Sequence, residues 1–225
     1  MRSTSLGDPP ASPVKPGALG LRWRWLRRLL LAALLTCLLG GLLHRPLLRG
    51  FARAWMIEGQ AGEADVIVMS TGVREHMFQQ CLAWHRAGLA PRLVLTDAET
   101  RQTDRAGITE PMREVRLRQL RVAGLTEDAV AVIGHEISCL HEEFAALADW
   151  ARTNHVRRVL LPTDPFATRR VQWLSERMLK PAGVEARVVP LDVPDYTVEE
   201  WWRKEAGLIA FENEWVLLPF YWARY

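Results

Sequence analysis

Short apolar runs alternate with amphipathic segments along the chain from residue 64 onward. The apolar runs predict five buried strands, at residues 65–69, 92–96, 129–133, 159–161 and 184–191. Segments with apolar residues at helical spacing follow the first four runs, as in the stretch that carries Met77, Cys81 and Trp84. Strands that alternate with helices predict a parallel sheet covered on both faces. We therefore expect an α/β fold, a Rossmann-like doubly wound parallel sheet with strand order 3-2-1-4-5.

A different pattern precedes this domain. Residues 1–21 are rich in Pro, Gly and Ser and predict a disordered cytoplasmic tail. Residues 22–48 place Arg and Trp in front of an uncharged core from Leu29 to Leu43, which predicts a membrane anchor. Residues 49–63 are then a linker, and residues 64–225 form the α/β domain.

The anchor has a rival interpretation as a cleaved signal peptide. Gly40-Gly41-Leu42-Leu43-His44 lacks a small-x-small cleavage site, which favours an uncleaved single-pass anchor. More positive charge lies before the apolar core than after it. This asymmetry predicts a cytoplasmic N-terminus and a domain on the outer side of the membrane.

Charge and cysteine content narrow the classes of function. The formal net charge is +3, but basic residues are concentrated in the first 53 residues, and acidic residues outnumber basic ones in the remainder. A nucleic-acid partner is therefore not expected. The three cysteines set no disulfide framework, although a Cys81–Cys139 bridge stays open, and no Cys/His spacing indicates a metal site. We expect no cofactor.

Tryptophans gather beyond Leu191, where the strand–helix alternation stops. Two short helices are expected there, at 198–205 with Trp201 and Trp202, and at 208–221 with Trp215. Packing against the sheet is the favoured interpretation of these aromatic residues. A membrane-interface contact is the alternative, because a membrane anchor begins the chain.

Candidate ligand-binding residues lie in the loops that follow the strands. Open α/β sheets bind ligands at the carboxyl ends of their strands, and strands 1 and 4 meet there at the switch point. Hydroxyls, backbone amides and arginines at this edge suit a phosphate or carboxylate. The candidates are Thr71, Gly72, Arg74, Asp97, Ser138, Cys139, Glu142, Thr163, Asp164, Arg169 and Arg170.

Two of these positions carry specific arguments. Arg169 and Arg170 lie at a helix start and oppose the helix dipole, which indicates an anionic ligand or a carboxylate partner. Cys139 at a helix start is either a nucleophile with a lowered pKa or a small capping residue, and the second interpretation is favoured. No Gly-x-Gly-x-x-Gly, Walker or Gly-x-Ser-x-Gly motif occurs, so no catalytic residue is assigned.

Several stretches, in order, resemble the YdcF/SanA/ElyC-like family of bacterial proteins. They cover about residues 64–221 and comprise 66–74, Ser138-Cys139-Leu140-His141-Glu142, 160–170, and Trp201-Trp202 with Glu214. The resemblance implies a Rossmann-like domain. Several members have one N-terminal membrane helix and are associated with envelope integrity or with peptidoglycan and lipid-carrier metabolism. Another member resembles a binder of S-adenosylmethionine.

Departures from that family affect the expected chemistry. Ser70-Thr71-Gly72 stands where the family has a run of glycines, Cys139 where it has Thr, and Ala167 where it has His. If that His is catalytic in relatives, this chain has kept binding without the reaction. We expect an envelope-biogenesis factor that binds or processes an anionic, phosphate-bearing envelope or peptidoglycan precursor. The alternatives are a module for S-adenosylmethionine or a nucleotide-like molecule, and a non-catalytic scaffold that docks a membrane-protein partner.

Overall fold

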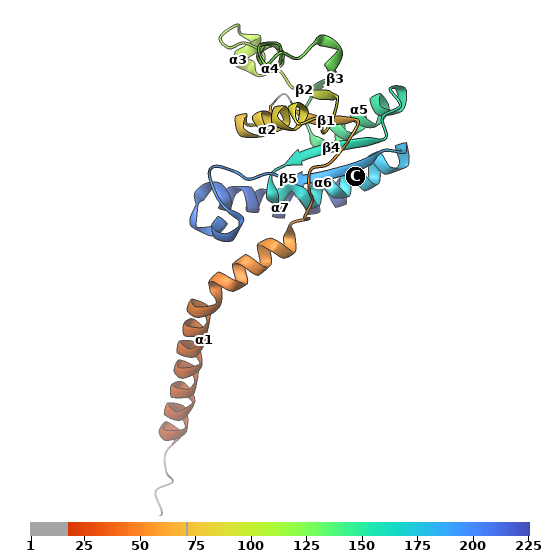
Figure 1. Cartoon of the computed structure of the whole chain (residues 1–225). Coiled ribbons are helices and arrows are strands. Elements are labelled where there is room, and N and C mark those ends of the chain that lie inside the picture. Colours follow the sequence, from red (N-terminus) through yellow and green to blue (C-terminus); the bar gives the residue numbers. More distant parts are fainter. Residues whose placement is uncertain (1–17, 71) are drawn as a thin grey trace, which may run out of the picture. The chain divides into compact units, whose positions relative to one another are not determined.

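The computed structural model describes residues 18–70 and 72–225. Its centre is a parallel sheet of five strands, drawn as arrows in Figure 1. The strands lie in the order β3-β2-β1-β4-β5, so the expected fold class and strand order are confirmed. Their bounds are β1 Val66–Ser70, β2 Arg92–Ala98, β3 Val130–Ile137, β4 Arg158–Thr163 and β5 Glu185–Pro190.

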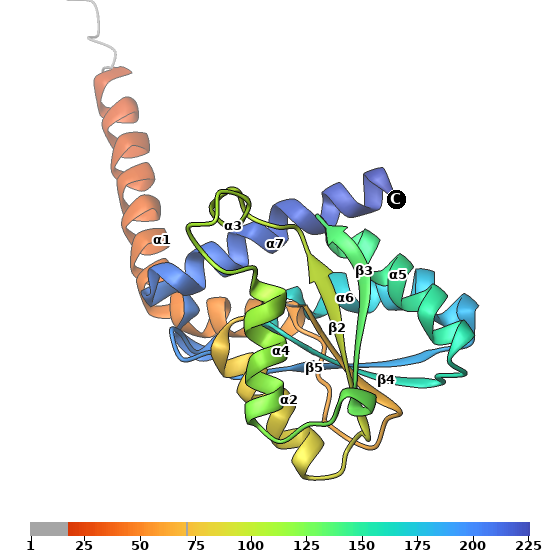
Figure 2. The ribbon, with the colours of Figure 1, turned by 90° about the horizontal axis from the view of Figure 1, so that it is seen from above.

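Helices connect the strands and cover both faces of the sheet. Figure 2 shows α2 (Glu75–Arg86) and α4 (Met112–Val122) on one side, and α5 (Leu140–Thr153) and α6 (Thr168–Leu174) on the other. The short α3 (Gln102–Arg105) lies between β2 and α4. A 3-10 turn at Pro165–Ala167 leads into α6, which continues as a wider π turn at Ser175–Leu179 and a 3-10 turn at Lys180–Ala182. These crossovers fix the parallel order.

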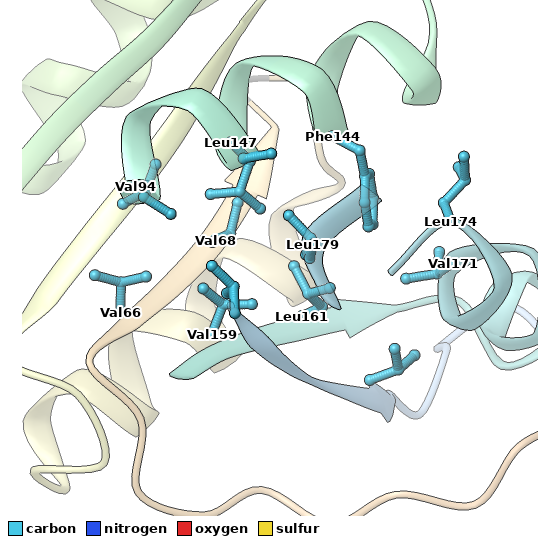
Figure 3. Close-up of a cluster of buried hydrophobic side chains, with 14 of the residues drawn as sticks. Val66, Val68, Val94, Phe144, Leu147, Val159, Leu161, Val171, Leu174 and Leu179 are labelled. Carbon is cyan, nitrogen blue, oxygen red and sulfur yellow. The ribbon is translucent and has the colours of Figure 1, made fainter. Parts of the chain in front are cut away.

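Alternation along each strand divides the core into two layers. Val66 and Val68 of β1 face the α5–α6 side, whereas Ile67 and Met69 face the α2–α4 side. Figure 3 shows Leu147 of α5 facing this first layer. Because both faces are covered, the strands are buried runs of branched apolar residues.

The N-terminal helix α1 (Ala18–Trp55) is longer than the sequence predicts. Its stretch from Trp23 to Trp55 is apolar and long enough to cross a membrane, with a mean hydropathy of 1.9 in its most apolar window. The chain divides into two compact units after Leu47, and we call Leu48–Tyr225 the sheet unit. The predicted disordered tail mostly lies outside the described residues.

The expected linker at 49–63 is wrong in its first half. Residues 49–55 continue α1, and Ala52 is completely buried in a third core cluster with Phe166 and Phe211. Leu48, Ala52 and Trp55 recur at helical spacing, which places one apolar face of this turn against the sheet unit. The first residues of the sheet unit are therefore helical, and the unit begins well before residue 64.

Two further boundaries differ from expectation. The strand expected at 129–133 is longer than predicted, because β3 runs to Ile137 through an irregular register opposite 96–98. Glu136 adopts a positive φ of 51° there and accepts hydrogen bonds from the Thr100 amide and Arg105. The C-terminal part has a 3-10 helix at Val198–Arg203 and a single 20-residue helix α7 (Glu205–Arg224), longer than the helix expected at 208–221.

Candidate functional site

The loops after β1 and β4 lie side by side at the carboxyl edge of the sheet. We call residues 70, 72–74 and 163–164 the β1–β4 edge. The Gly72 amide donates to the Ser70 hydroxyl (3.2 Å) and the Val73 amide to the Ser70 carbonyl (3.2 Å), which tightens the turn. Arg74 is the N-cap of α2, so the positive end of that helix dipole faces this edge. Thr71 lies outside the described residues.

Arg74 joins the two predicted loops. Its guanidinium donates to Asp164 (3.1 Å) and to Asp195 (3.1 Å), and about half of the side chain remains exposed. Two residues expected to share a site, from loops 90 positions apart, therefore meet directly. The arginine is held in place but stays open to solvent on one side.

Asp164 is the fixed partner in this arrangement. It accepts hydrogen bonds from the Tyr196 hydroxyl (2.6 Å) and the Phe166 amide (3.1 Å), and its side chain is 20% exposed against 57% for Asp195. Burial and the Asp164 charge raise the pKa of Tyr196, so the hydroxyl stays protonated as a donor. Asp195 is the partner that a ligand can displace at lower cost.

Arg116 braces the same turn from α4. Its side chain is buried, donates to the Val73 carbonyl and to Glu75 (2.7 Å), and lies 4.5 Å from the Phe78 ring centroid. Sequence reasoning missed this residue. Its spacing could have indicated it: Arg116 lies four positions before the apolar Leu120, so both side chains lie on the same, inward face of α4.

The neighbouring strand β2 ends in a second polar group. Asp97 is nearly buried and lies 3.2 Å from Arg113 and 3.8 Å from His135. It therefore has partners of its own, separate from Arg74.

Glu143 of α5 lies deeper and was not predicted from the sequence. Burial raises its pKa to about 7, and the nearby Thr96 hydroxyl and the Arg170 charge offset this only in part. The sequence could have indicated this residue by its spacing. Glu143 lies four positions before Leu147 and therefore on the apolar side of α5. A carboxyl group of this kind is protonated for much of the neutral range.

Arg170 has an intramolecular carboxylate partner. It donates two hydrogen bonds to Glu214 of α7 (2.8 and 2.6 Å), and the two side chains are only 12% and 8% exposed. Burial lowers the pKa of Arg170, but Glu214 outweighs it and the net change is upward. Of the two interpretations open from the sequence, a ligand or a carboxylate, the structure supplies the carboxylate.

Arg169 is also engaged within the chain. It donates to the carbonyls of Trp55 (2.8 Å) and Ala54 (2.6 Å) and lies 5.8 Å from the Trp55 ring centroid. A basic side chain on the last carbonyls of a helix stabilises its negative end. Arg169 thus links the end of α1 to the start of α6.

The β3–α5 junction forms a closed local motif. Glu142 accepts from the amide (2.8 Å) and hydroxyl (2.9 Å) of Ser138, and these bonds hold the pKa of the Glu142 carboxyl below its usual range. Cys139 is the N-cap of α5, and its sulfur lies 3.9 Å from the Tyr225 hydroxyl.

Thr163 is buried at the end of β4, where its carbonyl accepts from the Leu191 amide.

The structure therefore brings Gly72, Arg74, Thr163 and Asp164 to the β1–β4 edge and gives Arg169 and Arg170 separate partners. Across residues 18–70 and 72–225, no three His, Cys, Asp or Glu side chains are grouped to hold a metal ion. Neither protein-family models nor curated protein sequences give a match to the chain.

Proposed function

We propose that the protein is a membrane-anchored cell-envelope factor that binds an anionic, phosphate-bearing envelope or peptidoglycan precursor at the β1–β4 edge. The observation that carries the proposal is Arg74, a half-exposed arginine oriented by Asp164 at the switch point. The resemblance to the YdcF-like family supports the envelope role.

The chemistry of the edge suits a phosphate that takes the place of Asp195. The ion pair between Arg74 and the more exposed Asp195 breaks. Asp164 keeps the guanidinium aligned, because the Tyr196 hydroxyl holds this carboxylate in place. The start of α2 adds the positive end of its helix dipole beside it. A phosphate in the place of Asp195 keeps Arg74 paired with two anionic groups, while the exposed Asp195 carboxylate returns to water.

We expect Arg74→Ala to weaken phosphate binding about ten-fold or more, because a charge-assisted contact contributes roughly 1.5–3 kcal/mol. Binding of the full chain in detergent micelles is measured with a polyprenyl phosphate, a nucleotide sugar, inorganic phosphate and S-adenosylmethionine. Arg152→Ala is the matched control, because this exposed α5 arginine pairs with Asp149 and lies outside the β1–β4 edge.

Unchanged affinity in Arg74→Ala would contradict the proposed site. Tightest binding of S-adenosylmethionine or the nucleotide sugar would instead support the nucleotide-like module. If none of the four compounds binds, a non-catalytic scaffold becomes the better description. That second candidate is favoured by the intramolecular partners of Arg169 and Arg170.

The proposed location is the bacterial inner membrane, with a cytoplasmic N-terminus and the sheet unit outside. The long apolar helix α1 supports a single pass, and the arginines ahead of its core support this orientation. We expect a fluorescent reporter that folds only in the cytoplasm to give no signal when fused after Tyr225. The same reporter fused before Met1 should fluoresce, and a bright C-terminal fusion would reverse the topology.

A further inference from the structure

The C-terminal helix α7 carries exposed apolar side chains in addition to its buried face. Its buried face carries Gly207, Phe211, Glu214, Leu218 and Tyr221. Six large hydrophobic side chains on the same helix are exposed, and together we call them the α7 outer face: Leu208, Ile209, Trp215, Val216, Phe220 and Trp222.

This concentration sets α7 apart from the rest of the sheet unit. Among the described residues after α1, the other exposed large hydrophobics are Ile108 and Val122, which stand alone. Isolated exposed apolar residues are ordinary, whereas a contiguous apolar face marks an interaction surface. An ordinary surface helix buries its apolar side and exposes its polar side. On α7, apolar side chains lie both on the buried side and among the exposed residues.

The outer face continues directly into the end of the membrane helix. Trp215 stacks on Phe51 (ring centroids 5.7 Å apart) and on Trp55 (5.3 Å), both in the last turns of α1. Phe51 follows Arg45, the first charge after the apolar core, by six residues, or about 9 Å along a helix. In the sequence, this aromatic cluster therefore begins within a few residues of the end of the apolar core.

The residues of this region match the chemistry of a bilayer interface. Trp and Phe prefer the boundary between hydrocarbon and headgroups, where their rings are amphipathic or apolar. Arg45 and Arg224 flank the cluster in sequence and suit anionic headgroups, whereas Arg53 pairs with Glu199 (3.7 Å). Glu212 is exposed on the same helix and fits only at the hydrated level of such an interface.

We propose that the α7 outer face lies in the interface of the bilayer that α1 crosses, so that the sheet unit is held at the membrane by two contacts. The occupant is phospholipid. This inference does not rest on the proposed ligand site, and its test needs no ligand.

The test uses the full chain in vesicles of neutral lipid with anionic phosphatidylglycerol. A nitroxide is attached at Val216→Cys, with Cys37 and Cys139 changed to Ser, and its accessibility to oxygen and to a water-soluble nickel complex is measured. Val122→Cys in the same background is the matched control, because this α4 valine is also exposed. We expect a several-fold higher oxygen-to-nickel ratio at 216 than at 122.

Equal, water-like ratios at both positions would overturn the proposal. Spin–spin broadening at 216, or protection from both reagents, would also overturn it, since it would show a second copy or a protein partner on this face. A label at residue 220 (Phe220→Cys) should repeat the result for 216, which guards against local misfolding of one variant.

Discussion

Replacing Glu214 by alanine is expected to destabilise the sheet unit by about 3–5 kcal/mol, because it leaves the buried Arg170 guanidinium without its carboxylate. Both side chains are nearly excluded from solvent, and the pair ties α7 to α6. Arg170 also lies 5.2 Å from the Tyr221 ring centroid, and this cation–π contact offsets only part of the loss of the carboxylate. Denaturant unfolding of the full chain in mild detergent, followed by tryptophan fluorescence, measures the change.

Two variants control this result. The double change Arg170→Met with Glu214→Leu removes both charges and should recover most of the lost stability. Arg203→Ala breaks an exposed pair with Glu200 and should cost less than about 1 kcal/mol. A Glu214→Ala protein as stable as the unchanged chain would contradict the structural role of the pair and return Arg170 to the ligand candidates.

The sheet was predictable because its information is local. Each buried strand is a run of apolar residues such as 66–69, and each helix shows its own spacing, so neighbours within about ten residues determine the element. The order 3-2-1-4-5 then follows from right-handed crossovers with few alternatives.

The ends of elements were less predictable because distant residues decide them. The extension of α1 to Trp55 depends on Ala52 packing against Phe166 and Phe211, which are far away in the sequence. The last part of β3 similarly depends on Glu136 reaching Thr100 and Arg105.

The site was predictable as a location and less so as a set of contacts. Arg74 and Asp164 follow from topology alone, since adjacent parallel strands end at one edge. The helix-dipole argument correctly predicted an anionic partner for Arg170. That partner, Glu214, lies 44 residues later in the chain, so sequence spacing could not identify it. The resemblance to the YdcF-like family and its envelope role stay predictions.

Glu143 leads to the second large expected effect, a loss of stability with rising pH. Its pKa is about 7 in the folded chain against an ordinary value of 4.5. Between these values the folded state holds a proton that the unfolded state has released, so stability falls as pH rises. We expect this carboxyl group to cost about 2–3 kcal/mol at pH 8 relative to pH 4.5.

Glu143→Gln isolates that contribution, because glutamine stays neutral and can still hydrogen-bond near Thr96. The variant should be more stable than the unchanged chain at pH 8, and the two should converge near pH 4.5. Glu142→Gln is the matched control, and its effect on stability should have the opposite sign, because Ser138 holds the pKa of Glu142 below its usual range. That variant should lose stability at neutral pH and converge with the unchanged chain in acid. If Glu143→Gln has no advantage at pH 8, the carboxyl group is ionised and solvated in the folded protein, and the raised pKa is wrong.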